Sequence, residues 1–208
     1  MTTKRVLWDW NGTLLDDMAV WYKAVQEIFY HFGKTPPTLD EYFRELSGHY
    51  REIYTSRGVH APNEELDRIY ERFYLLRSGT VELSHGAQET LKALHDNNVM
   101  CGIVSSQTPL LFDTLFRRLA LREFFSHLRY PVFQKVETIQ ELLFLEGISA
   151  HDCIYIGDTP SDVRAAKKAG VVSVAYLNGY IPKSLIDAAN PDHTVRDLKE
   201  ILDIIEGH

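Results

Sequence analysis

The run Val-Leu-Trp-Asp-Trp-Asn-Gly-Thr at residues 6–13 constrains this chain more than any other segment. Residues 4–8 have the apolar composition of a buried strand, and Asp9 follows them directly. Gly12 and Thr13 come next, so we expect a sharp turn there that leaves a carboxylate at the edge of a sheet. Open α/β sheets bind their ligands at the carboxyl ends of strands. The run therefore predicts a ligand site at Asp9.

The second half of the chain alternates between short apolar runs and helical patterns. Strands are predicted at 99–104, 128–130, 153–157 and 172–176, and helices near 86–96, 110–119, 136–146, 160–169 and 197–206. Strands that alternate with helices are typical of a parallel sheet covered by helices on both faces. The predicted fold class is therefore α/β.

The segment from about residue 17 to residue 78 has helical periodicity instead. Apolar residues recur at helical spacing, as at Val25, Ile28, Phe29 and Phe32. Glycines and prolines divide the segment into about four helices. A helical insertion directly after the first strand predicts a core made of two sequence pieces, with an all-helical cap between them.

Composition sets broad limits on compartment and partners. The 208 residues suffice for one core, or for a core with a small second domain. The net charge of −7 argues against nucleic-acid binding, and no stretch approaches the roughly 20 apolar residues that cross a membrane. Cys101 and Cys153 lie in apolar runs, and the N-terminus has no apolar signal segment. We expect buried reduced thiols and a cytoplasmic protein.

Two further segments carry polar groups at predicted strand ends. Ser105 and Ser106 follow the strand at 99–104, where a hydroxyl can bind a phosphoryl oxygen or cap a helix. Asp158 ends the strand at 153–157, and Asp162 lies four residues later. Two nearby carboxylates repel each other, so a divalent cation bound between them would explain why they lie close together. Their hard oxygens suit Mg²⁺, although either acid could instead cap a helix.

Lys135 precedes a predicted helix and is the only lysine between Ser105 and Asp158. Taken alone it is most simply an exposed lysine. A fixed ammonium among carboxylates would instead neutralise phosphate charge.

The segments around Asp9, Ser105, Lys135 and Asp158 together resemble, in order, the four motifs of the haloacid dehalogenase superfamily. The resemblance covers nearly the whole chain, although Val136 stands where proline usually follows the lysine. The helical insertion resembles the caps of the phosphoglycolate phosphatase and β-phosphoglucomutase branch.

This resemblance implies a domain organisation and a set of residue roles. It implies a Rossmann-like, three-layer parallel-sheet core over 1–15 and 84–208, and a helical cap over 16–83. Asp9 would be the nucleophile that forms an aspartyl-phosphate. Thr13, read from its place in the turn, could hydrogen-bond to Asp9 or be an ordinary turn hydroxyl. The implied substrate-binding residues are Gly12, Arg51, Ser105, Ser106 and Lys135. The implied Mg²⁺ ligands are Asp9, the backbone carbonyl of Asn11, Asp158 and, directly or through water, Asp162.

The cap contains a segment, Leu46–Arg51, that resembles the substrate-facing loop of this branch. Arg51 could offer a charged fork to an anionic substrate, or be an ordinary exposed helix residue. His49 and Tyr50 are weaker candidates. Trp21, Tyr22, Phe29 and Phe73 are expected in the cap core rather than against a substrate.

Asn11 departs from the family pattern, which has a second aspartate there. An asparagine cannot carry a proton, and such acid–base help is worth roughly 10² to 10⁴ in rate. The chain could be a slow phosphatase, one selective for good leaving groups such as acyl or aryl phosphates, or a protein with a long-lived aspartyl-phosphate. Superfamily dehalogenases carry an aromatic residue at this position, so dehalogenation is disfavoured. Deamidation at Asn11-Gly12 would create the missing acid.

The predicted function is Mg²⁺-dependent hydrolysis of a small phosphorylated metabolite, phosphoglycolate-like by resemblance, through phospho-Asp9. The alternative is a regulatory or ligand-binding protein that binds phosphate with little turnover. We expect a monomer or homodimer.

Overall fold

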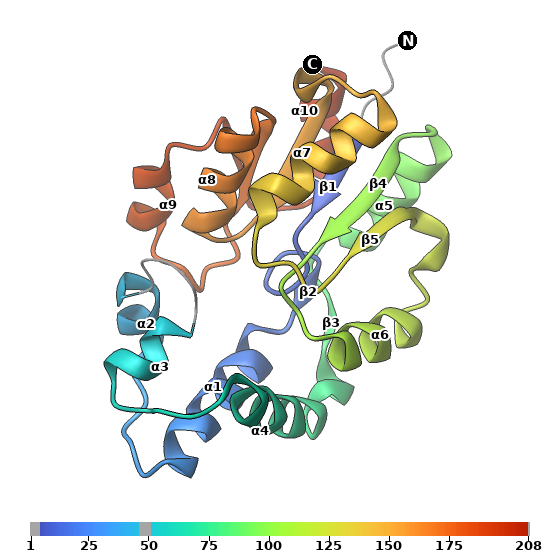
Figure 1. Ribbon diagram of the computed structural model, residues 1–208. Coiled ribbons are helices and arrows are strands. Elements are labelled where there is room, and N and C mark those ends of the chain that lie inside the picture. Colours follow the sequence, from blue (N-terminus) through green and yellow to red (C-terminus); the bar gives the residue numbers. More distant parts are fainter. Residues whose placement is uncertain (1–4, 46–50, 208) are drawn as a thin grey trace.

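The computed structural model describes residues 5–45 and 51–207, and its centre is a six-stranded sheet (Figure 1). The strand order is β5-β4-β1-β6-β7-β8, and all the neighbouring strands run parallel. The strands are β1 (Arg5–Trp8), β4 (Met100–Val104), β5 (Phe125–Arg129), β6 (Cys153–Gly157), β7 (Val172–Tyr176) and β8 (His193–Val195). The predicted α/β class with a Rossmann-like core is confirmed.

Helices cover both faces of the sheet because neighbouring side chains of a strand point to opposite faces. On β1, Leu7 packs in a cluster with α7 (Lys135–Glu146) and α8 (Pro160–Ala169). Val6 and Trp8 pack in a second cluster on the other face. The helices of that second face are α5 (Ala87–Asp96), α6 (Pro109–Arg118) and α10 (Glu200–Glu206). Both faces of the central strand are therefore buried, as expected for a parallel sheet.

A helical segment follows the first strand, as predicted. It comprises α1 (Met18–His31), α2 (Leu39–Glu45), α3 (Glu52–Ser56) and α4 (Asn63–Leu75). These four helices are called the helical segment. Two short antiparallel strands, β2 (Leu15–Asp16) and β3 (Glu82–Leu83), connect it to the core. Figure 1 places it on the side of the sheet where the strands end. It therefore lies over the edge that is expected to carry the site.

The remaining elements are short or lie at the edges of the sheet. They are α9 (Lys183–Ala189) and the 3₁₀ turns Ser78–Thr80, Arg122–Phe124 and Ala150–Asp152. Neither α9 nor β8 was predicted from the sequence, and β5 was predicted at 128–130. Both β5 and β8 are edge strands with partly exposed polar side chains, so they lack the continuous apolar run that marks a central strand.

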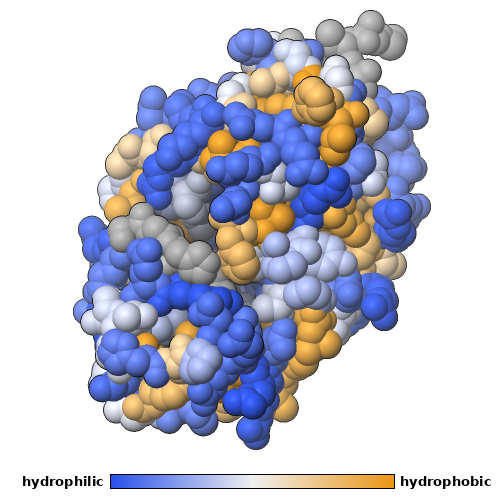
Figure 2. All heavy atoms as spheres, viewed as in Figure 1, coloured by the Kyte–Doolittle hydropathy of each residue, from blue (hydrophilic) through white to orange (hydrophobic). Residues whose placement is uncertain are grey.

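Cys101 and Cys153 are buried free thiols, as predicted. Within the described ranges, none of the helices is long and apolar enough to cross a membrane. On the face shown in Figure 2, hydrophilic side chains prevail and hydrophobic ones form separate patches between them.

Candidate active site

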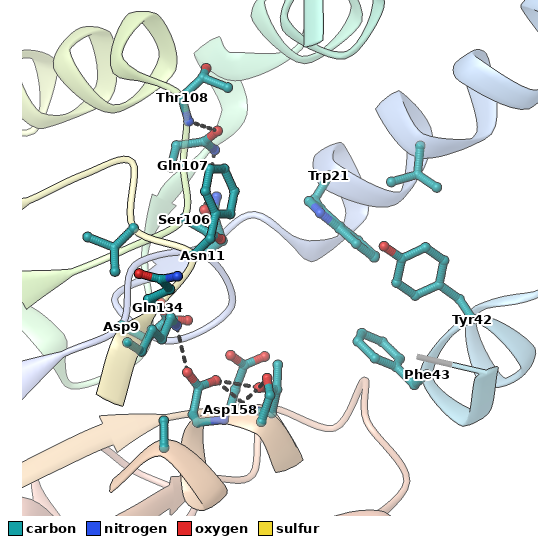
Figure 3. Close-up of a pocket in the computed structure, with 18 of the residues that line it drawn as sticks. Asp9, Asn11, Trp21, Tyr42, Phe43, Ser106, Gln107, Thr108, Gln134 and Asp158 are labelled. Carbon is teal, nitrogen blue, oxygen red and sulfur yellow. Dashed lines mark hydrogen bonds and ion pairs between the residues drawn. The ribbon is translucent and has the colours of Figure 1, made fainter. Parts of the chain in front are cut away.

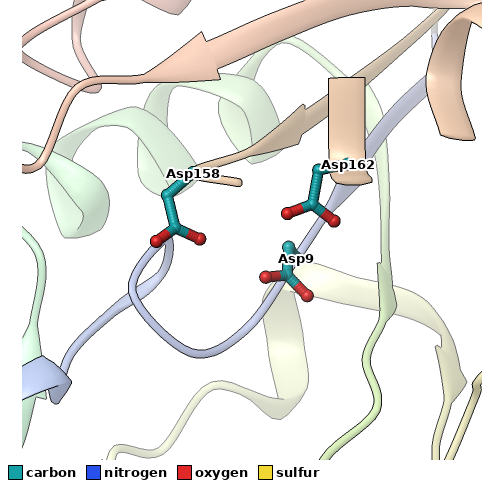
Figure 4. A group of neighbouring side chains, drawn as sticks. All are labelled: Asp9, Asp158 and Asp162. Atoms are coloured by element: carbon teal, nitrogen blue, oxygen red, sulfur yellow. The ribbon is translucent and has the colours of Figure 1, made fainter. Parts of the chain in front are cut away.

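Three carboxylates meet at the carboxyl ends of two central strands (Figure 4). Asp9 follows β1 and Asp158 follows β6, and the parallel register pairs Trp8 with Ile156 just before them. Asp162 lies in the first turn of α8, which begins directly after Asp158. One oxygen from each residue lies within 4.8 Å of the others, and all three residues are buried. The structure thus brings together three of the predicted metal ligands.

Lys135 is the counter-charge of this cluster. It is the first residue of α7, and its Nζ lies 2.8 Å from Asp9 Oδ1 and 2.6 Å from Asp162 Oδ1. Burial acts to lower the pKa of Lys135, but the carboxylates of Asp162 and Asp9 outweigh it and raise that pKa well above its ordinary value. The predicted lysine is therefore a charged part of the site rather than an exposed residue.

One ammonium does not balance three buried carboxylates. Burial raises the pKa of Asp9 to about 7, although Lys135 opposes the shift. Burial, together with the charges of Asp9 and Asp162, raises the pKa of Asp158 well above its ordinary value. Such an excess of negative charge is what a bound divalent cation would relieve, and carboxylate oxygens are the ligands that Mg²⁺ prefers. The residues present therefore fit a divalent metal.

Asp162 has a structural role beside any metal-binding one. Its Oδ2 accepts hydrogen bonds from the backbone N–H of Thr159, at 3.1 Å, and from the Thr159 hydroxyl. Thr159 and Asp162 form the capping box of α8. Asp162 thus caps a helix, as the alternative interpretation held, and also binds Lys135. Its coordination of a metal stays a prediction.

Asp158 is held by groups from two other loops. Thr13 donates its hydroxyl to Asp158 Oδ1 at 3.1 Å, which corrects the prediction that it would bond to Asp9. Asn178 donates from Nδ2 to Asp158 Oδ2 at 2.8 Å and to the Gly12 carbonyl at 3.0 Å. The sequence analysis missed Asn178, although it is a polar residue two positions after the end of β7.

Gly12 is required by the turn after β1. Its φ is +72°, and a Cβ built on it would lie 2.4 Å from Asp158 Oδ2. Glycine is therefore the residue that allows the turn and the carboxylate to approach each other. The structure offers no test of its predicted role in substrate binding.

The side chain of Asn11 is held on both sides. Its Nδ2 donates to Asp17, and its Oδ1 accepts from Gln107 Nε2 at 3.3 Å. Asp17 is fully buried and also accepts from the Gly12 N–H, at 2.8 Å, and from the Tyr74 hydroxyl, at 2.6 Å. Burial raises the pKa of Asp17 to about 6, although hydrogen bonds from Tyr74 and Asn11 oppose the shift. Asp17, Gln107 and Tyr74 were not predicted as site residues, because no local pattern in the sequence marks them.

The loop after β4 forms another side of the site. Ser105 is 1% exposed, and its hydroxyl oxygen accepts from the Gln107 N–H at 3.1 Å. Ser106, Gln107 and Thr108 line the adjoining cavity (Figure 3). Both predicted serines therefore lie at the carboxyl edge of the sheet, with Ser105 buried behind the cavity wall.

A cavity of about 530 Å³ separates this edge from the helical segment. Asp9, Asn11, Lys135, Asp158 and Asp162 line one side. Trp21, Tyr42 and Phe43 project toward it from the helical segment on the other side (Figure 3). Trp21 is thus at the cavity and not only in the core of the helical segment, where Phe29 is fully buried.

Arg51 is not among the residues that line this cavity. It precedes α3, and its Nη2 lies 2.9 Å from Oδ1 and 2.8 Å from Oδ2 of Asp67. The predicted anion fork is therefore paired with a carboxylate of α4. His49 and Tyr50 lie outside the described residues.

Comparison with known proteins decides the family. Residues 6–176 match the family described as "Haloacid dehalogenase-like hydrolase". The chain belongs to this family. The match spans β1 to β7, so the haloacid dehalogenase-like core includes every strand that carries a residue of the site.

Relatives and solved structures agree with this assignment. A phosphoglycolate phosphatase of Pseudomonas putida is 27% identical over 95% of this chain and 78% of its own length. A Lactobacillus plantarum structure assigned as a phosphoglycolate phosphatase has a TM-score of 0.82 at 19% identity, covering 98% of this chain and all of that one. A Thermotoga maritima structure assigned as a β-phosphoglucomutase has a TM-score of 0.71 at 19% identity, covering 98% and 99%. The predicted resemblance, and with it a haloacid dehalogenase-like hydrolase of the phosphatase class, is confirmed.

Proposed function

We propose that this protein is a Mg²⁺-dependent phosphatase that hydrolyses a small phosphorylated metabolite through a phospho-Asp9 intermediate. The observation that carries the proposal is the Lys135 bridge. A lysine distant in sequence spans Asp9 and Asp162, beside Asp158, on one side of a cavity. A structural ion pair needs one carboxylate, whereas phosphoryl transfer needs a nucleophile with fixed positive charge around it.

Asp9 is the proposed nucleophile. Its carboxylate must be ionised to attack phosphorus, and Lys135 favours the ionised form through its contact at 2.8 Å. The same ammonium would stabilise the negative charge of the transferring phosphoryl group. Ser106 and neighbouring groups of the loop after β4 would orient the phosphate, with Ser105 supporting the loop from behind.

The metal would be held by Asp9, Asp158 and the backbone carbonyl of Asn11, with Asp162 acting directly or through water. When bound, Mg²⁺ neutralises charge on phosphoryl oxygens and orients them. Replacing an aspartate by Asn11 leaves this carbonyl in place. Thr13 and Asn178 would keep Asp158 oriented toward the cation.

Asn11 limits the proton transfers of this reaction. Its Oδ1 can accept a hydrogen bond from an attacking water, but the carboxamide cannot take or give a proton. Because its Nδ2 donates to Asp17, the oxygen is the part of the amide directed toward Gln107. We therefore infer that Asn11 orients the water that hydrolyses phospho-Asp9 but does not act as a base.

The helical segment is proposed to be the cap, with residues 16–83 forming one domain and residues 1–15 with 84–208 the other. Its apolar face closes the cavity over the reacting groups and would exclude water. Relatives named phosphoglycolate phosphatase make phosphoglycolate one candidate substrate, to be compared with other small phosphate esters.

Asn11 also favours a second candidate, a regulatory protein that binds phosphorylated ligands with little turnover. One assay distinguishes the two. Phosphate release from a panel of esters is measured with Mg²⁺ and with EDTA, for the natural chain, Asp9→Ala and Asn11→Asp. The phosphatase proposal expects Mg²⁺-dependent turnover that Asp9→Ala abolishes, and acid quenching should trap phosphate on Asp9. If the natural chain releases no more phosphate than Asp9→Ala from any ester, the phosphatase proposal fails and the binding function is favoured, whether or not Asn11→Asp gains turnover.

A further inference from the structure

The cavity wall opposite the acidic cluster is apolar and aromatic. The described residues that the helical segment contributes include Met18, Trp21, Val25, Tyr42, Phe43 and Tyr70. Trp21 packs edge-on against Tyr42, with ring centroids 5.0 Å apart, and stacks with Phe43 at 5.9 Å. Figure 3 shows these three rings across the cavity from Asp9, Asn11 and Asp158. The leaving group of a bound phosphate ester would therefore contact aromatic rings.

Charge on this wall does not suit a carboxylate. Among the described lining residues of the helical segment, the one charged side chain is Asp67, which pairs with Arg51. Besides Lys135, the described lining cations are Arg164 and Lys168, which belong to α8 on the core side and are exposed. On that wall the carboxylate of a substrate such as phosphoglycolate would meet aromatic rings and tyrosine hydroxyls, and no cation among the described residues of the wall would compensate for its lost water.

Asn11 restricts the leaving group independently of the wall. The carboxamide cannot protonate the departing oxygen, so an alcohol would have to leave as a strongly basic alkoxide. A phenol leaves readily as an aryloxide, because the ring stabilises its negative charge. The catalytic side of the cavity therefore favours the same class of leaving group as the aromatic wall.

We propose that the site acts on aryl phosphates, with the ring of the leaving group against Trp21 and Phe43; this inference rests on the phosphatase function proposed above. An Asp9 carboxylate oxygen bonds to phosphorus, and the bond between phosphorus and the aryl oxygen breaks. The electron pair leaves with the aryloxide, which takes its proton from water. A second water then attacks the phosphorus of phospho-Asp9 and releases inorganic phosphate and the Asp9 carboxylate. A cavity of about 530 Å³ has room for a phosphate with one or two fused rings.

The test compares kcat/KM for phenyl phosphate, 2-naphthyl phosphate and phosphoglycolate with Mg²⁺. The two aryl esters have leaving groups of similar basicity and differ mainly in apolar area. We expect 2-naphthyl phosphate to exceed phenyl phosphate by about tenfold, as burial of one further ring predicts. Phosphoglycolate should be the poorest of the three. A phosphoglycolate kcat/KM equal to or above both aryl values overturns the inference.

Variants of Phe43 connect the preference to the wall. Phe43→Leu keeps an apolar side chain and tests for the ring, and Phe43→Ala also removes volume. Both should lower kcat/KM for 2-naphthyl phosphate about tenfold more than they lower that for acetyl phosphate, a small substrate with a good leaving group. Phe144→Ala is the matched control, since Phe144 is 85% exposed and lies away from the cavity.

The outcomes separate the two proposals. Turnover of acetyl phosphate that depends on Asp9, without an aryl preference, retains the phosphatase and overturns the aryl inference. The aryl inference is also overturned if Phe43→Leu loses kcat/KM equally for 2-naphthyl phosphate and acetyl phosphate while its midpoint of thermal unfolding is unchanged. If no ester is hydrolysed in an Asp9-dependent way, the phosphatase proposal itself fails.

Discussion

The carboxamide of Asn11 donates a hydrogen bond to the buried carboxylate of Asp17. This contact sets which end of the amide faces each neighbour, because a carboxylate can only accept at neutral pH. Asp17 is held in turn by the Gly12 N–H and the Tyr74 hydroxyl. The departure from the family pattern at position 11 is thus part of a hydrogen-bonded group and not an isolated substitution.

The Asn11→Asp variant should be limited by Asp17. Two carboxyl groups would then be in contact and would have to share a proton. The pKa of the new carboxyl group would therefore be poorly matched to proton transfer, and the fold would be less stable. The double variant Asn11→Asp/Asp17→Asn restores a donor and an acceptor with their roles exchanged. We expect the double variant to gain about 10² to 10⁴ in kcat on alkyl phosphates, and much less on aryl phosphates.

Steady-state kinetics of the natural chain, both single variants and the double variant check this prediction. Asp17→Asn alone is the control, because it supplies no new acid. A single Asn11→Asp variant that is as active and as stable as the double variant would contradict the inferred coupling.

Deamidation of Asn11 should be slow in the folded protein. The reaction requires the Gly12 backbone nitrogen to attack the Asn11 amide, but the Gly12 N–H is held by Asp17 Oδ1 at 2.8 Å. We expect peptide mapping to find Asn11 largely intact after prolonged incubation, and converted faster when the chain is unfolded in urea. Equal rates in both states would show that Asp17 gives no protection, and would renew the hypothesis that an aged residue 11 supplies the acid.

Removal of Lys135 should destabilise the fold as well as abolish turnover. Lys135→Met leaves three buried carboxylates without their ammonium, and breaking a buried ion pair costs about 3 kcal/mol or more. Lys183→Met is the matched control, since its pair with Asp187 is exposed and should be worth less than about 0.5 kcal/mol. Urea denaturation in EDTA measures both free energies of unfolding. Similar losses in the two variants would be incompatible with the structure.

Asp192 should contribute stability that is lost in acid. Burial acts to raise the pKa of Asp192, but hydrogen bonds from the Ser173 hydroxyl, at 2.6 Å, and N–H, at 2.9 Å, outweigh it and lower that pKa below its ordinary value. The unfolded chain therefore takes up the proton first as the pH falls. The contribution is present above the ordinary pKa of about 4 and disappears below it as the folded carboxylate is protonated.

The measurement is the difference in free energy of unfolding between the natural chain and Asp192→Asn, at pH 7 and near pH 3. We expect a clear difference at pH 7 and a smaller one at pH 3. Ser173→Ala should remove part of the pH 7 difference, which a double-mutant cycle would detect. A difference that grows toward low pH would have the wrong sign.

The central strands and their motifs were predictable because their signals are local. Buried parallel strands such as β1 and β6 are almost continuous apolar runs, and each is followed by an aspartate at the point where the chain turns. The edge strands β5 and β8 bury little, so burial leaves no such pattern in them. Asp9, Lys135 and Asp158 could be named because they belong to recognisable segments in a fixed order.

Asp17, Tyr74, Gln107 and Asn178 could not be found in the same way. They come from the residue before α1, from α4 and from the loops after β4 and β7, and each contacts a partner that is distant in the chain. The pairing of Arg51 with Asp67 could not be predicted for the same reason, since it depends on how α3 packs against α4.

By itself, the sequence determined the class of fold, the family and the order of the catalytic segments, because backbone periodicity and turn chemistry act over a few residues. Only the tertiary structure decided how the charges are shared. It placed Lys135 between Asp9 and Asp162, turned Thr13 toward Asp158 and set Asn11 against Asp17. Burial in a common low-dielectric site couples these groups, and such coupling depends on distances in space rather than on spacing along the chain.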